Sequence, residues 1–350
     1  MTSAAGSDLH LALRLNLYRS AALDVPVDLV QAADEIGYHS VWSAEAYGTD
    51  ALSPLAYLAG LTRRIKLGTA IAQLAARPPA TLAMHAMTID ALAGGGRVII
   101  GVGVSGPQIV EGWYGQPWGK PTDRLRDYLA IVRKVLDREA PVTHDGPEIS
   151  LPYKGPGSSG QGKALRSILH AVAPIPLWVA SGGDRNTELC AEVADGWLPM
   201  GLGSESHLAS LERGWKARGG RPDGFEVFTS FSAQLTDDVA GTLDRMRPLT
   251  AMYVGGMGSA THNFHKDAMA RRGFPAEAAR IQELWLAGRK EEAVAAVPDE
   301  YLEQTAFLGD EQRIRRRWAS WSPPPLATGL IVDVPGIEEL RLVAQLRDGS

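Results

Sequence analysis

The sequence contains a single cysteine, Cys190, among its 350 residues. No internal disulfide can form, so the fold has to be held by a hydrophobic core, and one cysteine is typical of a reducing compartment. The formal net charge is only −5, and no block of basic residues interrupts the chain. We therefore expect neither nucleic acid nor an anionic membrane as a partner.

Long hydrophobic runs are also missing. No apolar stretch reaches the ~18 residues that a transmembrane helix needs. Residues 1–18 lack a basic region followed by an unbroken apolar core, so no secretory signal peptide is predicted. These absences favour a cytoplasmic protein.

The chain is instead rich in short β-type runs that alternate with longer helical runs, and hydrophobic residues make up 45% of it. Residues 140–170 contain too much Gly, Pro and Ser for a regular element, and a long, mainly helical insert is predicted at 237–320. Strands are predicted at 9–18, 39–45, 65–71, 97–104, 175–183, 196–202, 225–235 and 327–334.

Eight strands with helical connections favour parallel pairing through right-handed crossovers. The closed form of that arrangement is the (β/α)8 TIM barrel, here a single domain over residues 1–350 with the helical insertion between the seventh and eighth strands. An open, doubly wound sheet is the alternative.

Gly101, Gly103 and Gly106 spell G-x-G-x-x-G directly after an apolar run. A dinucleotide fingerprint needs a helix opening at the third glycine and an acidic residue ~20 residues later at a strand end. Here the next long helix starts well after Gly106, and Asp127 falls inside that helix. We therefore interpret the glycines as positions where the backbone closely approaches another group at the end of a barrel strand, or where crowding at the rim is relieved.

Three stretches resemble a known family. Residues 37–115, from "GYHSVW" to "GWYG", resemble the luciferase-like monooxygenase superfamily, and the likeness extends over about residues 10–345. The stretches "GGDRNTELCAEVADGWLP" and "MYVGGMGSATHNF" are similar to its actinobacterial, coenzyme F420-dependent branch. The resemblance implies a TIM barrel with a helical insertion before the last strand and a flavin or deazaflavin at the C-terminal mouth.

The implied activity is hydride transfer between C5 of F420 and a small organic substrate. An FMN-dependent monooxygenase that uses O2 and a partner flavin reductase is the alternative on the same barrel. A barrel that has lost catalysis and only binds a ligand is a third interpretation. The family also implies a homodimer or a higher homo-oligomer.

Cofactor contacts are implied at the ends of the third and fourth strands. Residues 69–71 correspond to a non-proline cis peptide beneath the cofactor ring in family members. Arg77 is expected either to meet the phosphate or glutamate tail of the cofactor or to be solvated. The residues assigned to the cofactor here are Thr69, Ala70, Ile71, Gln73, Ser105 and Gly106.

A phosphate site is predicted after the fifth strand. Gly182 and Gly183 leave backbone N–H groups open just before a helix whose N-terminus carries partial positive charge. Ser181 and Asn186 are expected to add hydrogen bonds, and Arg185 to add charge. The family places the cofactor phosphate at this turn, and a plain capped turn is the alternative.

The catalytic candidates are Glu45 and Tyr47, after the second strand, and Tyr18, at the end of the first. Several relatives carry an acidic residue followed by a histidine at the second position, whereas this chain has Ala46 in place of the histidine. That departure leaves the proton donor unassigned. Glu45 is expected to act as an acid or base, or to form a salt bridge at the barrel rim.

Trp113 and His262 are candidates for contacts with the small-molecule substrate. His262 and His265 have a spacing that suits a metal, but no nearby Cys or acidic pair completes a site, so no metal is expected. Cys190 lies within a helical apolar pattern and is expected to be a buried small residue.

Overall fold

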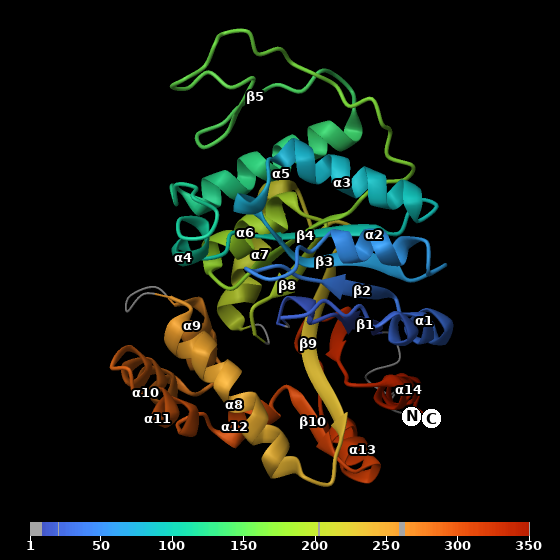
Figure 1. The fold of residues 1–350 in the computed structure, drawn as a ribbon, viewed down its shortest axis with the longest axis vertical. Coiled ribbons are helices and arrows are strands. Elements are labelled where there is room, and N and C mark those ends of the chain that lie inside the picture. Colours follow the sequence, from blue (N-terminus) through green and yellow to red (C-terminus); the bar gives the residue numbers. More distant parts are fainter. Residues whose placement is uncertain (1–8, 20, 202–203, 259–262, 350) are drawn as a thin grey trace. The chain divides into compact units, whose positions relative to one another are not determined.

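The computed structural model describes residues 9–19, 21–201, 204–258 and 263–349 (Figure 1). The chain divides into two compact units. Unit 1 comprises Met1–Arg14, Pro199–Leu208 and Glu226–Ser350, and unit 2 comprises Leu15–Leu198 and Ala209–Phe225.

Unit 2 is built on a run of neighbouring strands in the order β2-β3-β4-β7-β8. The pairs β2–β3, β3–β4 and β4–β7 are parallel, and every residue of β2 and β4 is buried. The bounds are β2 (Ser40–Ser43), β3 (Lys66–Gln73), β4 (Val98–Gly103), β7 (Leu177–Ser181) and β8 (Gly196–Pro199).

Helices follow these strands because apolar residues recur at helical spacing between them. In Figure 1, α3 and α5 lie side by side beyond β3 and β4. The helices of this part of the chain are α1 (Val27–Ile36), α2 (Ser53–Ala59), α3 (Pro79–Leu92), α4 (Pro107–Val110), α5 (Pro121–Asp137), α6 (Asp184–Val193) and α7 (Glu205–Arg218).

Two tryptophans and two glycines pack together between the strands of unit 2. The rings of Trp42 on β2 and Trp178 on β7 are each 1% exposed, and their centroids lie 5.1 Å apart. A Cβ atom at Gly68 would lie 2.5 Å from the Trp42 ring, and one at Gly196 would lie 2.5 Å from the Trp178 ring. The two glycines therefore leave the space that these large rings fill.

The segment after α5 is mostly irregular, as expected, but it contains a short antiparallel hairpin of β5 (His144–Asp145) and β6 (Ser150–Leu151). Asp127 on α5 holds this hairpin: its carboxylate accepts the N–H groups of Glu148 and Ile149, both at 2.8 Å, and lies 3.0 Å from Nε2 of His144. Asp127 is therefore a structural residue.

Unit 1 contains a run of parallel strands in the order β10-β9-β11-β1. These are β1 (His10–Arg14), β9 (Glu226–Leu235), β10 (Ala306–Gly309) and β11 (Gly329–Asp333), and helix α14 (Ile337–Asp348) follows β11. The first strand is shorter than the expected 9–18, since β1 ends at Arg14 and a 3-10 turn, Leu17–Arg19, follows.

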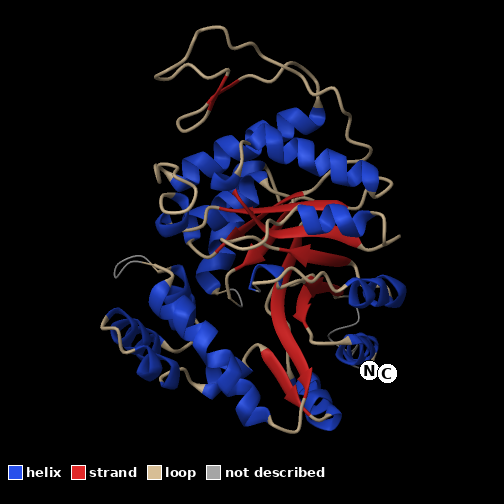
Figure 2. Ribbon diagram, in the orientation of Figure 1, coloured by secondary structure: helices blue, strands red, loops and turns tan. Residues whose placement is uncertain are grey.

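The insert between β9 and β11 is almost entirely helical in Figure 2. It has a hydrophobic cluster of its own, which includes Leu243, Met269, Ile281 and Leu302. Its one departure from the expectation, within the described residues, is the strand β10, which pairs with β9. The helices are α8 (Val239–Gly256), α9 (Phe264–Arg271), α10 (Pro275–Leu286), α11 (Lys290–Ala295), α12 (Asp299–Glu303) and α13 (Glu311–Ser320).

Along the described chain, the strands β1, β2, β3, β4, β7, β8, β9 and β11 follow one another with helices between nearly all of them. This is the (β/α)8 TIM barrel class, with the helical insertion before the last strand, and it confirms the predicted fold. The open-sheet alternative and the dinucleotide-binding interpretation of the glycines are thereby excluded.

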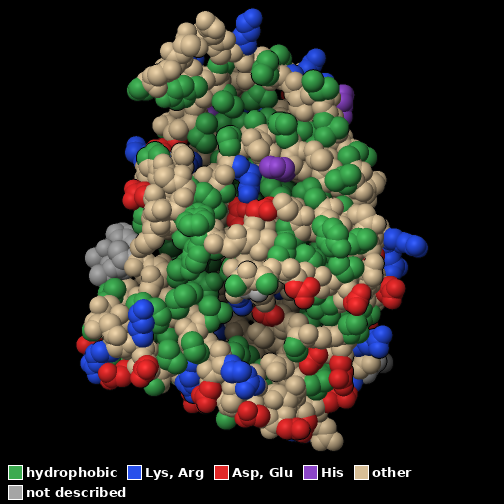
Figure 3. Space-filling view, viewed as in Figure 1, with side chains coloured by type: hydrophobic (Ala, Val, Ile, Leu, Met, Phe, Trp, Pro, Cys, Tyr) green, Lys and Arg blue, Asp and Glu red, His purple; other side chains and the backbone are tan. Residues whose placement is uncertain are grey.

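Acidic and basic side chains are mixed on the face drawn in Figure 3, in keeping with the small net charge. Across the described ranges, none of the helices combines the length and the apolar character needed to cross a membrane.

Candidate active site at the strand ends of unit 2

The end of β3 is irregular. A cis peptide bond joins Ala70 and Ile71, and the pairing with β4 shifts in register between Thr69 and Ala72. The expectation of a non-proline cis peptide at residues 69–71 is therefore confirmed.

Two glycines of β4 lie beside this irregular strand end. A Cβ atom at Gly101 would lie 2.1 Å from the carbonyl oxygen of Thr69, and one at Gly103 would lie 3.0 Å from Cδ1 of Ile71. These distances are too short for an ordinary side chain at Gly101 and tight at Gly103. The first two glycines of the G-x-G-x-x-G pattern therefore make room for the bulged end of β3.

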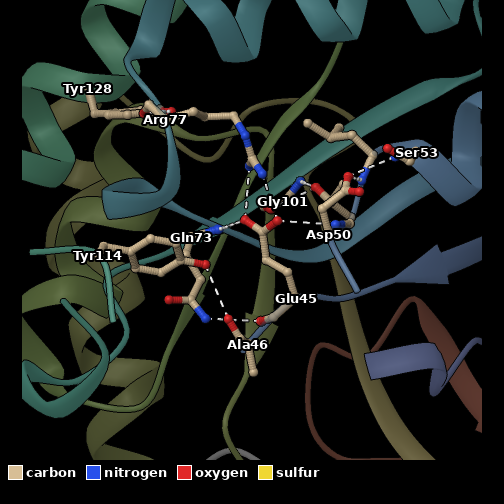
Figure 4. Close-up of polar contacts among 12 residues, drawn as sticks. Glu45, Ala46, Asp50, Ser53, Gln73, Arg77, Gly101, Tyr114 and Tyr128 are labelled. Atoms are coloured by element: carbon tan, nitrogen blue, oxygen red, sulfur yellow. Dashed lines mark hydrogen bonds and ion pairs between the residues drawn. The ribbon is translucent and has the colours of Figure 1, made fainter. Parts of the chain in front are cut away.

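Glu45 follows β2 and lies buried between three segments of unit 2 (Figure 4). Arg77 grips its carboxylate with two parallel hydrogen bonds, Nη1 to Oε1 at 2.9 Å and Nη2 to Oε2 at 2.7 Å. The same oxygens accept the backbone N–H groups of Gln73 at 2.7 Å and of Ala51 at 3.1 Å. Four donors thus surround one carboxylate, so the salt bridge expected as one of the two roles of Glu45 is present.

Arg77 is neither solvated nor directed away from the protein. Its side chain is 12% exposed, and that of Glu45 is 3% exposed. Burial works against the charge of the guanidinium, but the hydrogen bonds and the negative charge of Glu45 outweigh burial and raise the pKa of Arg77. The sequence did not reveal this pair, because its partners are 32 positions apart and meet only when β2 and β3 pair.

Only one of the two polar atoms of the Gln73 carboxamide has a hydrogen-bond partner among the described residues. Its Nε2 donates to the backbone carbonyl of Glu45 at 3.0 Å, while its Oε1 is buried and has no hydrogen-bond partner among the described residues. A flipped amide would place two oxygens against each other, so this orientation follows from the network. A buried acceptor without a partner is expected to meet a ligand or a water.

Two tyrosines complete the polar cluster in Figure 4. The hydroxyl of Tyr114 donates to the carbonyl of Ala46 at 3.2 Å, and that of Tyr128 donates to the carbonyl of Arg77 at 3.0 Å. Burial, together with the nearby negative charge of Glu45, raises the pKa of both phenols. Both tyrosines therefore keep their protons at neutral pH.

The turn after β7 has the open geometry expected of an anion site. Gly183 is the N-cap of α6, no side chain caps that helix, and a Cβ atom at Gly183 would meet nothing within 4 Å. The hydroxyl of Ser181 is taken up by contacts of 2.8 Å with Thr187 and with Nε1 of Trp197. Oδ1 of Asn186 accepts from Thr122 at 2.7 Å, which leaves its amide group to donate.

The other candidates have different surroundings. Tyr47 and Trp113 are 53% and 61% exposed, and their rings meet edge to face with centroids 6.4 Å apart. Tyr18 lies in the 3-10 turn after β1, where its hydroxyl accepts a hydrogen bond from Arg19 at 3.1 Å. Ser105 has a positive φ of 60° just before Gly106, the N-cap of α4.

The histidine candidates belong to unit 1. His262 lies outside the described residues. The ring of His265 packs at a tilt against that of Tyr253, with centroids 4.6 Å apart, and burial lowers the pKa of His265 to about 4. Cys190 is fully buried on α6, as expected, and burial raises the pKa of its thiol.

The fold and the strand-end cluster define a TIM-barrel enzyme, because such barrels carry their sites at the C-terminal ends of the strands. The family model of the luciferase-like monooxygenases matches residues 10–322, and the chain belongs to this family. The superfamily predicted from the sequence is thereby confirmed.

Within this family, the chain is similar to proteins that are named as F420-dependent enzymes. A protein of Mycobacterium tuberculosis that carries the provisional name of coenzyme F420-dependent oxidoreductase is 39% identical over 346 residues, covering 97% of this chain and 99% of that protein. The structure of the coenzyme F420-dependent tetrahydromethanopterin reductase of Methanopyrus kandleri matches with a TM-score of 0.73 and 20% identity, over 97% of this chain and 98% of that one.

A structure of an F420-dependent secondary alcohol dehydrogenase, in complex with an F420–acetone adduct, matches with a TM-score of 0.70 and 12% identity. It covers 97% of this chain and 96% of that chain. At these identities the two structures establish the barrel fold.

Proposed function

We propose that this protein is an F420-dependent oxidoreductase that transfers a hydride between the deazaflavin and a small organic substrate. The observation that carries the proposal is the full-length likeness, at 39% identity, to the mycobacterial protein provisionally named as such an enzyme. The alcohol dehydrogenase and the reductase with the same fold favour an alcohol, a ketone or an activated double bond as the reacting group.

The residues of unit 2 fit a phosphorylated ring cofactor. The turn at Gly183 offers a helix N-terminus that no side chain caps, together with open space, which suits a phosphate. Gln73 offers a buried acceptor without a partner, which suits an N–H group of a deazaflavin ring. When bound, F420 would supply a hydride from C5 of its reduced ring, or accept one at C5 of its oxidised ring.

The chain's own residues then divide into those that hold the strand ends in place and those that can donate a proton. The carboxylate of Glu45 is used by four donors, so we assign it to holding the strand ends in place. Tyr47 and Tyr18 remain the proposed catalytic residues, and each has a phenol hydroxyl that can donate a proton. The exposed ring pair of Tyr47 and Trp113 is proposed to contact an apolar part of the substrate.

The family name favours one alternative, an FMN-dependent monooxygenase acting with O2 and a flavin reductase. The two activities differ in the cofactor that binds and in oxygen consumption. Both need a phosphate at the turn after β7, so that turn does not distinguish them.

A pair of substitutions at one position tests the phosphate site. Gly183→Ala adds a methyl group to open space at a φ of −104°, which any residue adopts, so cofactor binding should be unchanged. Gly183→Asp adds a negative charge at the same place and should weaken F420 binding by about tenfold or more, measured by quenching of tryptophan fluorescence. Equal affinities for the two variants would refute the assignment.

A further inference from the structure

The side chain of Glu45 joins three pieces of chain that each carry part of the proposed cofactor site. Its own loop follows β2, Gln73 ends β3, and Arg77 lies just before α3. The backbone N–H of Glu45 also donates to the carbonyl of Ile71 at 3.2 Å, next to the cis peptide bond. One residue therefore bonds to both ends of the segment from Ile71 to Arg77.

The geometry of the pair suits positioning better than proton transfer. Each carboxylate oxygen accepts one guanidinium N–H and one backbone N–H. A carboxylate held by a fork of two parallel bonds has a defined plane as well as a defined position, because the guanidinium is itself planar. The carbonyl of Ile71 and the N–H of Gln73 are held relative to that plane.

Gln73 receives its orientation from the same residue. The backbone carbonyl of Glu45 binds Nε2 of Gln73, so Oε1 has to point away from Glu45. Gln73 is 4% exposed, and Oε1 has no partner in the described part of the chain. Leaving a buried acceptor unpaired costs stability, so its presence in an otherwise fully paired cluster indicates a ligand that supplies the missing donor.

We propose that Glu45 and Arg77 form a positioning pair that presents Oε1 of Gln73 to an N–H group of the bound deazaflavin ring. This inference rests on the proposed function, since it concerns the cofactor of that same site. Glu45 and Arg77 act through Gln73 and the end of β3. Gln73 is the residue that touches the cofactor.

Arg77→Lys is the first test, because lysine keeps the positive charge but loses the planar fork. We expect F420 binding, measured by quenching of tryptophan fluorescence, to weaken about fivefold to tenfold. The matched control is Arg124→Lys. Arg124 forms a pair with Glu148 of similar burial, with 16% and 15% of the side chains exposed and a distance of 3.1 Å, but this pair ties the hairpin segment to α5. The control should lower the thermal midpoint about as much and leave F420 binding unchanged.

Gln73→Leu is the second test and leaves both members of the ion pair intact. It removes one hydrogen bond to Glu45 together with the unpaired acceptor, so the thermal midpoint should change little. F420 binding should weaken by about threefold to tenfold. If Arg77→Lys does not fold, Gln73→Leu still tests the contact with the cofactor, and unchanged F420 binding in this variant refutes the proposal.

The outcomes distinguish a failure of the proposed function from a failure of the positioning pair. If the wild-type protein does not bind F420, the proposed function fails and this inference fails with it. If the wild-type protein binds F420 and either the folded Arg77→Lys variant or Gln73→Leu binds it equally well, the proposed function stands and the positioning pair is refuted. Weaker binding in Arg124→Lys to the same extent as in Arg77→Lys would also refute it, because the effect would then be one of general stability.

Discussion

The hydroxyl of Thr69 donates to the carbonyl of Gly101 at 2.8 Å and accepts the N–H of the same residue at 2.9 Å. A side chain on β3 thus satisfies both backbone groups of a residue on β4, at the place where the register between these strands shifts. The bulged end of β3 is therefore fixed to β4 by a side chain as well as by the strand pairing.

Thr69→Val should destabilise the protein by about 2 kcal/mol, because it leaves the buried N–H and C=O of Gly101 without their partner. Thr69→Ser keeps the hydroxyl and should cost about half as much. The measurement is chemical unfolding of the two variants beside the wild type. A larger loss in the serine variant would show that the methyl group matters and the hydrogen bonds do not.

His265 should make the protein less stable in mild acid. Burial holds its pKa at about 4, below the value of about 6.5 in an unfolded chain, so the unfolded state binds the extra proton between these values. The contribution of His265 is therefore complete above pH 6.5 and is lost as the pH falls towards 4, by up to about 3 kcal/mol. Unfolding at several pH values should show a shallower slope for His265→Gln than for the wild type, and identical slopes would contradict this.

Asn263 should matter more than an ordinary helix cap. Its Oδ1 accepts the N–H groups of His265 and Lys266, both at 3.0 Å, and its Nδ2 donates to the carbonyl of Val254 at 2.7 Å. Because the side chain is 3% exposed, Asn263→Ala should cost about 2 kcal/mol. The comparison is Asp310→Ala, which removes an exposed cap of α13 and should cost about 1 kcal/mol. Equal losses would mean that the bond to Val254 contributes nothing.

Asp127→Ala should loosen the segment after α5 without affecting the cofactor. The substitution removes the acceptor for Glu148, Ile149 and His144, so trypsin should cut at Lys154 and Lys163 faster than in the wild type. Binding of F420 should stay the same, because Asp127 holds the hairpin and is not part of a dinucleotide site. Lost binding with an unchanged rate of cleavage would contradict both statements.

The fold was predictable because its signals are local. Each apolar run bounded by glycine, proline or a helical pattern identified a strand within a few residues, as with β4 at Val98–Gly103 against the expected 97–104. The end of β1 was not predicted: apolar and polar residues continue to alternate past Arg14, but the strand ends there and the chain turns at Leu17–Arg19. Strand β10 was missed because four residues inside a helical insert become a strand only by pairing with β9.

The site was predictable only in part. The bulge at residues 69–71 and the glycines after β7 follow one strand each, so a resemblance along the sequence was enough to find them. The pairing of Glu45 with Arg77 and the unpaired Oε1 of Gln73 arise from contacts between separate segments. No pattern within one segment encodes such contacts, although an acidic residue and an arginine that follow neighbouring strands are a signal worth testing in other barrels.

The most direct test of the proposed function is binding of the purified protein to F420 and to FMN in parallel, measured by quenching of tryptophan fluorescence. We predict tight binding of F420 and weak binding of FMN. Tight binding of FMN with weak binding of F420, accompanied by oxygen uptake with a flavin reductase, would contradict it and identify a monooxygenase.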